Sequence, residues 1–453
     1  MTRRDTVLPW RHKPFPELMR LAWPIGVSML SYSVMTLVDT LFVGRLGPSA
    51  LAGVSVGGVA FFTLLCFGFG LLRSVKVLVS QAVGAGERDV LPYVGAGLLL
   101  AVGLGVLELL AGVVVSTGLH LVTASAEVGE LAGDYLRVRM MGAPIVLVGV
   151  ALREARYGRG DSRTPMRATV AANVANIGLD YLFIFGLGLG VTGAAWASVM
   201  AVAVEAAWLA VAQRREGFGL GREALAEIGA VWAMGWPLGL QMLLEVSSFA
   251  VLTAIFASMS EIDVAAHQIA LQVAHLSFLP AAALGEAASV LAGQAIGARQ
   301  HRLVTVVARR GLWAAVAYTG ACGVVYAVLA GPIASAFTDE PALIEAATHL
   351  LWVAAAFQLF DGANIVARCV LRGTGDVRYP AVISVVIAWV CTPPMALVLG
   401  YGLGLGALGG WLGLSVEIMV GAIVLWWRLE RRHWLPAARR SQVRLRRPEV
   451  VAA

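Results

Sequence analysis

Long apolar stretches alternate with short polar connections along almost the whole chain. A helix needs about 20 mainly apolar residues to cross the roughly 30 Å hydrocarbon core of a bilayer. The pattern therefore predicts twelve membrane-spanning helices joined by short connections. We place them at residues 16–42, 50–80, 92–117, 133–156, 165–186, 191–212, 230–257, 264–292, 308–332, 344–370, 379–400 and 407–428.

Composition supports a membrane protein and excludes a soluble one. Of 453 residues, 59% are hydrophobic and 14% are charged, whereas about 25% are charged in soluble domains. Soluble cores of ordinary size could not hide so many apolar side chains from water. The net charge of +6 comes from arginines grouped between apolar stretches, which indicates membrane topology and not nucleic-acid binding.

The distribution of basic residues predicts the orientation, because short cytoplasmic connections retain Lys and Arg. The N-terminal segment, the even-numbered connections and the C-terminal segment are rich in arginine. The odd-numbered connections are nearly bare. Arg137 and Arg139, at the outer start of the fourth helix, oppose the trend without overturning it. Both termini are therefore predicted to be cytoplasmic.

The chain is an internal duplication. Trp23-Pro24-Ile25-Gly26 recurs 213 positions later at Trp236, QAVGAG at Gln81 recurs as QAIGAR at Gln294, and GRGDSRTP at Gly158 recurs as GTGDVRYP at Gly373. Because each half has six helices, an even number, both halves enter the membrane from the same side. The two halves are then related by an axis along the membrane normal. The predicted fold is an all-α polytopic protein of two six-helix pseudo-symmetric bundles. Its parts are an N-terminal tail 1–15, an N-lobe 16–212, a cytoplasmic linker 213–229, a C-lobe 230–428 and a basic tail 429–453.

Ionisable groups at membrane depth cost about 2.5–3.5 kcal/mol each on insertion scales, so each calls for a pairing or a functional explanation. The first half places Asp39 near the outer end of helix one and Asn176 and Asp180 on one face of helix five. With Ser198 they would form an oxygen-rich cluster that can hold a proton or Na⁺. The alternative is that Asp180 is a helix-end group near the outer surface.

In the second half, Glu245 and Asp361 each lie in an apolar segment. Carboxyl groups in apolar surroundings titrate closer to neutral pH than in water, so such groups can load and release protons. Arg73 and Glu286 occupy equivalent positions of the duplication and, with Lys76, are candidates for a charge pair. That pair is either structural or a set of counter-charges for the carboxylates.

At these motifs the chain resembles a multidrug and toxic compound extrusion (MATE) transporter over almost its whole length. The matching features are Trp-Pro followed by Asp39, QAVGAG, GDSRTP with NVANIGLD, AAHQIA, QAIGAR, and FDGAN followed by RGTGDVRYP. Arg73 in GLLRSVKVL resembles the DNA-damage-inducible branch, whereas Glu245 and Asp361 resemble the other bacterial branch.

The resemblance implies a V-shaped pair of lobes in the bacterial inner membrane that rock to export organic, often cationic, compounds in exchange for H⁺ or Na⁺. It places the ion site of the first lobe at Asp39, Asn176, Asp180 and Ser198, and a Na⁺ ion in that site would be bound by the first three. At position 198, relatives more often carry threonine. It maps the conformational hinge onto Pro24 and the second-lobe carboxylates onto Glu245 and Asp361. It further implies a functional monomer among membrane lipids, with no cofactor and no enzymatic activity.

Two rival functions remain. A lipid-linked precursor flippase of the same superfamily would need a basic cavity, but apart from Arg73 and Lys76 the basic residues within the predicted helices lie near helix ends. An intramembrane transferase would need an Asp-rich, HxxxD or Ser-His motif, and the sequence has none.

Overall fold

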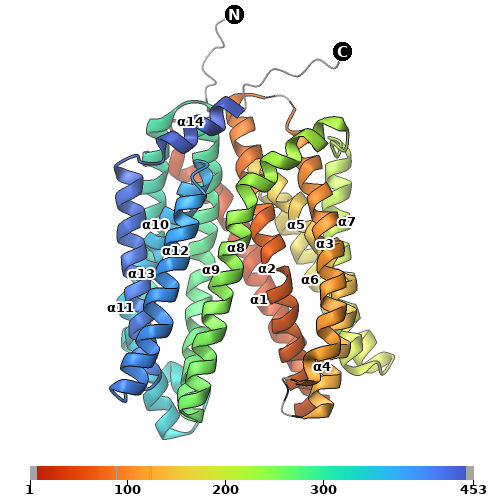
Figure 1. The fold of residues 1–453 in the computed structure, drawn as a ribbon, viewed down its shortest axis with the longest axis vertical. Coiled ribbons are helices and arrows are strands. Elements are labelled where there is room, and N and C mark those ends of the chain that lie inside the picture. The colour runs from red at the N-terminus through yellow and green to blue at the C-terminus, as the bar shows by residue number, and fades with distance from the viewer. Residues whose placement is uncertain (1–7, 88, 122, 124, 445–453) are drawn as a thin grey trace, which may run out of the picture. The chain divides into compact units, whose positions relative to one another are not determined.

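The computed structural model describes residues 8–87, 89–121, 123 and 125–444, and these residues form helices and turns without any strand (Figure 1). In chain order the helices are α1 (Pro14–Gly44), α2 (Pro48–Ala85), α3 (Leu91–Gly118), α4 (Ala126–Met141), α5 (Ala143–Gly158), α6 (Arg163–Asp180), α7 (Gly190–Arg214), α8 (Arg222–Met259), α9 (Glu261–Gly297), α10 (His301–Ser335), α11 (Pro341–Gly373), α12 (Arg378–Met395), α13 (Ala407–Glu430) and α14 (Leu435–Arg444). A short 3₁₀ turn (Leu119–Leu121) follows α3.

The predicted all-α membrane fold is confirmed. Among the described residues, eleven spans are long and apolar enough to cross a membrane, and the bent pair α4–α5 makes up to twelve. That pair replaces the fourth predicted helix, residues 133–156, and is bent by 50°. Gly142 separates the two helices and Pro144 lies in the first turn of α5. Proline lacks a backbone N–H and clashes with the preceding turn, which accounts for the break.

Two helices end in π-helical turns at equivalent positions of the duplication. α6 runs into η2 (Tyr181–Gly186) and α12 runs into η3 (Ala396–Gly402), with starting residues 215 positions apart. Such π-helical turns are frequent at functional sites in proteins. Asp180 is the last residue of α6 and directly precedes η2.

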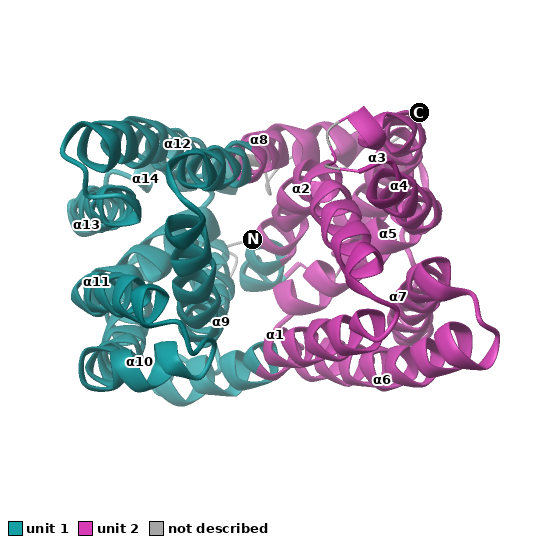
Figure 2. Cartoon of the chain, turned by 90° about the horizontal axis from the view of Figure 1, so that it is seen from below, with its two compact units in different colours: residues 1–26, 80–86, 244–453 teal, residues 27–79, 87–243 magenta. Residues whose placement is uncertain are grey.

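The chain forms two compact units, coloured separately in Figure 2. Unit 1 contains residues 1–26, 80–86 and 244–453, and unit 2 contains residues 27–79 and 87–243. Each unit is built mainly from one half of the duplication, but α1, α2 and α8 each contribute residues to both units. The boundary in α1 follows Gly26, two positions after Pro24.

Within unit 2, α7 packs against α4, α5 and α6, and α3 packs against α4 and α5. Within unit 1, α11 packs against α9, α10 and α13. A large apolar core in this unit surrounds the fully buried side chains of Phe256 and Trp411. Cys369 packs beside Ala281 and Ile365.

The repeated QAVGAG and QAIGAR segments pack directly against each other inside unit 1. A Cβ atom on Gly84 would collide with the backbone of Gln294, and a Cβ atom on Gly297 would collide with the backbone of Gln81. Only glycine permits so close an approach of two helices. The side chains of the two glutamines form hydrogen bonds with neighbouring segments. Gln81 Nε2 donates to the Gly373 carbonyl at 2.9 Å, and Gln294 Oε1 accepts from Trp10 Nε1, just before α1, at 2.7 Å.

The C-terminal helix α14 lies against the same end of unit 1. Ser441 donates a hydrogen bond to Gln81, Gln442 donates to the Ile296 carbonyl at 2.7 Å, and Trp434 just before the helix is fully buried. Trp10, which precedes α1, and α14 thus both contact the end of α9. The segments next to the two termini therefore lie at one end of this unit.

Candidate functional site

The first candidate site is a pair of carboxyl groups in unit 2. Asp39 comes from α1 and Asp180 from the end of α6, and their side chains lie within hydrogen-bonding contact of each other. Asp180 is completely buried, so it is not a solvated helix-end group. Two carboxylates repel at this separation and neither can donate, unless one carries a proton. The contact is therefore favourable only while one of the two acids carries a proton.

Asn176 and Ser198 complete the predicted cluster. Asn176 lies one turn before Asp180 on α6 and is fully buried, and Ser198 of α7 is 5% exposed. Both polar atoms of Asn176 and both carboxyl oxygens of Asp180 have no hydrogen-bond partner by ordinary donor and acceptor geometry among the described residues. Buried polar atoms are nearly always satisfied by protein or water, so this place suits water or a coupling ion.

Two residues of α4, Tyr135 and Arg139, also belong to this site and were not predicted from the sequence. The Tyr135 hydroxyl forms a hydrogen bond with Ser198. The Arg139 guanidinium interacts electrostatically with Asp39 and Asp180 and lies 4.2 Å from the centre of the Phe61 ring. Arg139 is one of the two arginines that opposed the orientation trend. Its departure from the expected distribution of basic residues was thus the sequence signal that could have assigned Arg139 to this site.

A second polar centre of unit 2 surrounds Glu205 of α7, which is 4% exposed. Its carboxylate accepts hydrogen bonds from Arg153 Nη1 at 3.1 Å, Thr169 Oγ1 at 3.0 Å and the Tyr32 hydroxyl at 3.3 Å. These donors come from α5, α6 and α1. No partner for Glu205 could be identified from sequence, because the pairing depends on how four helices are rotated toward one another.

Of the candidate charge pair, Lys76 has a partner within unit 2. Its ammonium group lies 3.0 Å from the Glu154 carboxylate, and both side chains are largely buried. Arg73 belongs to unit 2 and Glu286 to unit 1, so their pairing stays a prediction. The Lys76–Glu154 pair neutralises a lysine for which the sequence had indicated Arg73 and Glu286 as companions, without Glu154.

Unit 1 contains its own centre of charge around Arg368 of α11. Arg368 Nη1 lies 3.0 Å from Glu245 Oε1 of α8. Asp361 interacts electrostatically with the same guanidinium, as does Glu417 of α13, which accepts a hydrogen bond from Thr392. The two predicted second-half carboxylates thus meet at one arginine, together with a third acid.

The duplication relates the arginines of the two centres. Arg153 and Arg368 are 215 positions apart, the same offset that relates GRGDSRTP to GTGDVRYP. Each binds a carboxylate on another helix of its own unit. Extending the repeat alignment five residues upstream of Gly158 and Gly373 would have identified both arginines.

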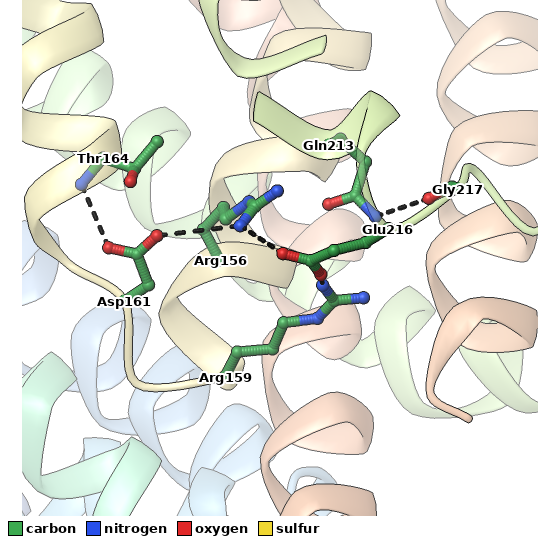
Figure 3. A network of polar contacts seen from close by, with 7 residues as sticks. All are labelled: Arg156, Arg159, Asp161, Thr164, Gln213, Glu216 and Gly217. Atoms are coloured by element: carbon green, nitrogen blue, oxygen red, sulfur yellow. Dashed lines mark hydrogen bonds and ion pairs between the residues drawn. The ribbon is translucent and has the colours of Figure 1, made fainter. Parts of the chain in front are cut away.

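The GRGDSRTP motif itself forms a polar network at the end of unit 2 (Figure 3). Arg156 Nη1 lies 2.8 Å from Glu216, which also pairs with Arg159. Asp161 lies 3.8 Å from Arg156 and accepts a hydrogen bond from the Thr164 backbone N–H at 3.1 Å. The network ties the α5–α6 connection to the end of α7. These contacts give the motif a structural role.

The residues that the structure describes contain no group of three or more His, Cys, Asp or Glu side chains that could hold a metal ion. Asp39 and Asp180 are only two acids. Sodium bound by Asp39, Asn176 and Asp180 would therefore depend on amide, hydroxyl or water oxygens for its remaining ligands. That site stays a prediction.

Comparison with known proteins shows what the chain is similar to. The MatE family pattern matches residues 24–182 and 237–398, one match in each half. A probable multidrug resistance protein NorM of Burkholderia mallei is 32% identical over 439 residues, covering 92% of each chain. The corresponding protein of Deinococcus radiodurans is 33% identical, covering 90% of this chain and 93% of its own.

Solved structures agree with this fold. The eukaryotic MATE transporter AtDTX14 superposes with a TM-score of 0.87 at 18% identity, covering 96% of this chain and 99% of its own. An outward-facing MATE family multidrug resistance transporter superposes with a TM-score of 0.84 at 23% identity, covering 96% and 97%. Since the family pattern covers both halves and relatives above 30% identity span nine-tenths of the sequence, the chain belongs to the MATE family of transporters.

Proposed function

We propose that the protein is a secondary active antiporter that exports organic, often cationic, compounds in exchange for protons. The observation that carries this proposal is the contact between the Asp39 and Asp180 carboxyl groups in an apolar helical bundle. A pair that must hold a proton when closed, and that repels when the proton leaves, can convert proton binding into helix movement.

The same geometry favours H⁺ over Na⁺ as the coupling ion. Direct contact between two carboxyl groups is satisfied by one shared proton, whereas Na⁺ would separate the oxygens by its own coordination shell. Sodium coupling is the alternative, and transport measured under a pH gradient and under a Na⁺ gradient distinguishes the two.

The hinge proposed at Pro24 agrees with the unit boundary. α1 passes from unit 1 to unit 2 immediately after Gly26, and Asp39 lies farther along the same helix. Pro24 leaves one backbone carbonyl of α1 without its helical partner, so the helix bends there at lower cost than elsewhere. Protonation at Asp39 can in this way change the bend that joins the two units and drive rocking between inward and outward states.

Substrate preference follows from the charges of unit 1. Glu245, Asp361 and Glu417 all interact with Arg368, so these four residues together carry a net negative charge while the acids are ionised. This balance supports cationic substrates and opposes a flippase for anionic lipid pyrophosphates. Two basic groups of unit 2 are also neutralised, Lys76 by Glu154 and Arg153 by Glu205.

The proposed location is the bacterial inner membrane, with both termini cytoplasmic and the monomer as the functional form. Contacts of Trp10 and α14 with the same end of α9 support termini on one side. The arginines on and next to α14 support the cytoplasmic side for that end.

The experiment uses purified protein in proteoliposomes, with ethidium or norfloxacin as substrate and a pH gradient or a Na⁺ gradient imposed separately. Vesicles acidified inside should accumulate the drug, by up to about tenfold per pH unit when one proton is exchanged for each drug cation. Nigericin should abolish the accumulation, because it collapses the proton gradient.

A sodium gradient at equal pH on both sides should drive no accumulation. Transport by sodium alone would overturn the choice of coupling ion while preserving the antiport. Absence of transport under either gradient, by protein that binds the drug, would overturn the function.

A further inference from the structure

One face of α6 carries a continuous row of buried polar side chains. Thr169, Asn173, Asn176 and Asp180 follow at spacings of four, three and four residues, and each is at most 5% exposed. Residues spaced in this way lie above one another on a helix. Val170 and Val174, on another face, are 37% and 66% exposed. The polar row thus points into unit 2, away from lipid.

The row joins two carboxylate centres at different depths. Its outer end is Asp180, in contact with Asp39. Its inner end is Thr169, which donates to Glu205 at 3.0 Å. Eleven residues separate Thr169 from Asp180, which corresponds to about 16 Å along the helix. The row of polar side chains thus runs from the Asp39–Asp180 pair to the ion pair of Glu205.

The middle of the row is suited to water. Asn173 Nδ2 donates to Ser31 of α1 at 2.5 Å, but neither polar atom of Asn176 has a protein partner among the described residues. Leaving a buried amide unsatisfied costs about 1–3 kcal/mol. Ordered water that bridges such groups removes that cost. Side chains and water together would give an unbroken chain of hydrogen-bonding groups.

Charged and titratable groups of α1 and α5 face the inner carboxylate, Glu205. Tyr32 of α1 and Arg153 of α5 bond it directly, and Tyr157 of α5 interacts with it electrostatically. Next to Arg153, Glu154 pairs with Lys76 of α2. Arg153 thus interacts electrostatically with both carboxylates, Glu205 and Glu154.

We propose that Glu205 is the inner proton acceptor of the coupling pathway, a role that rests on the proton antiport proposed above. A proton leaves the carboxylic acid of the Asp39–Asp180 pair, passes through water along the polar face of α6 and binds the Glu205 carboxylate. The O–H bond of one acid is broken and that of the other is formed. Neutral Glu205 releases Arg153, and the proton then passes to water on the cytoplasmic side.

Glu205→Gln tests this role, because glutamine keeps the size of glutamate and one oxygen that can still accept from Arg153 and Thr169, but it cannot receive the proton. We expect proton-driven drug accumulation to fall by about 100-fold, the scale of a lost proton-transfer group. Exchange of labelled for unlabelled drug across the vesicle, without a pH gradient, should keep its rate because it needs no proton release. A structural defect would slow both reactions.

Three further variants distinguish a loss of proton transfer from a loss of folding. Glu205→Asp should restore part of the proton-driven activity. Thr169→Val, which has the same shape, removes one link of the chain and should slow accumulation but not exchange. Glu430→Gln, at a surface pair with Arg309, is the matched control and should behave as the unmodified protein. Should Glu205→Gln not fold, Thr169→Val provides the same comparison.

Full proton-driven accumulation by folded Glu205→Gln or by Thr169→Val would overturn the pathway. Equal losses of accumulation and exchange would overturn it as well, since they indicate a structural role. Failure of the unmodified protein to exchange drug for protons would overturn the antiport itself. Activity that is lost in Asp39→Asn but retained in Glu205→Gln would reject only the pathway.

Discussion

Asp39→Asn abolishes proton-driven export, with an expected loss of at least about 100-fold in the rate of drug accumulation. Asparagine is nearly the same size as aspartate, so helix packing around α1 is retained. It cannot gain or lose a proton, and the contact with Asp180 then no longer depends on protonation. The rate is measured in proteoliposomes acidified inside, and thermal unfolding in detergent checks that the protein is folded.

Asp180→Asn should give the same loss, because the two carboxyl groups act as one proton site. Asp134→Asn is the matched control: Asp134 lies on α4 of the same unit, is half-exposed and pairs with Arg137 at 3.2 Å. It should transport at the normal rate. Undiminished transport by folded Asp39→Asn would remove this residue from the coupling mechanism.

Arg368→Met causes the largest loss of stability that we expect from a single substitution. It leaves Glu245, Asp361 and Glu417 without the cation that they share. Because the Arg368–Glu245 pair is only partly buried, the cost should stay below about 3–5 kcal/mol, the cost of breaking a fully buried ion pair. The midpoint of thermal unfolding in detergent should fall by several degrees. Arg309→Met, at an exposed pair with Glu430, should leave the midpoint unchanged.

A second substitution distinguishes loss of charge balance from loss of packing. Glu245→Gln removes one of the three negative charges, so the Arg368→Met/Glu245→Gln double variant should be more stable than Arg368→Met alone. Equal stability of the single and double variants would show that Arg368 stabilises unit 1 through its packing and not through its charge.

The sequence predicted the helices well because spanning a bilayer requires long apolar stretches, which are visible without any knowledge of neighbours. It placed one helix over residues 133–156, where the structure has α4 and α5 bent at Gly142. Gly142 and Pro144 are surrounded by apolar residues, so a hydropathy window does not register them. It began the seventh helix at residue 230, whereas α8 begins at Arg222. The first turns of α8 are polar and lie outside the apolar window.

The candidate sites were predicted less completely than the fold. Asn176 and Asp180 could be placed together because their spacing defines one helix face. Contacts between helices, such as Tyr135 with Ser198 or Arg153 with Glu205, depend on helix rotation and depth, which one sequence does not specify. Arg139 was counted as an exception to topology, although a cation in that place is better explained by the acids that it faces.

The most direct measurement of the central claim is proton release on drug binding. Ethidium is added to purified protein in weakly buffered detergent solution that contains a pH indicator, and binding is followed in parallel by fluorescence. The unmodified protein should release protons as the drug binds, and the Asp39→Asn/Asp180→Asn double variant should bind the drug without releasing any. Equal proton release by both proteins, or none by the unmodified protein, would contradict the claim that protonation of this carboxyl pair drives export.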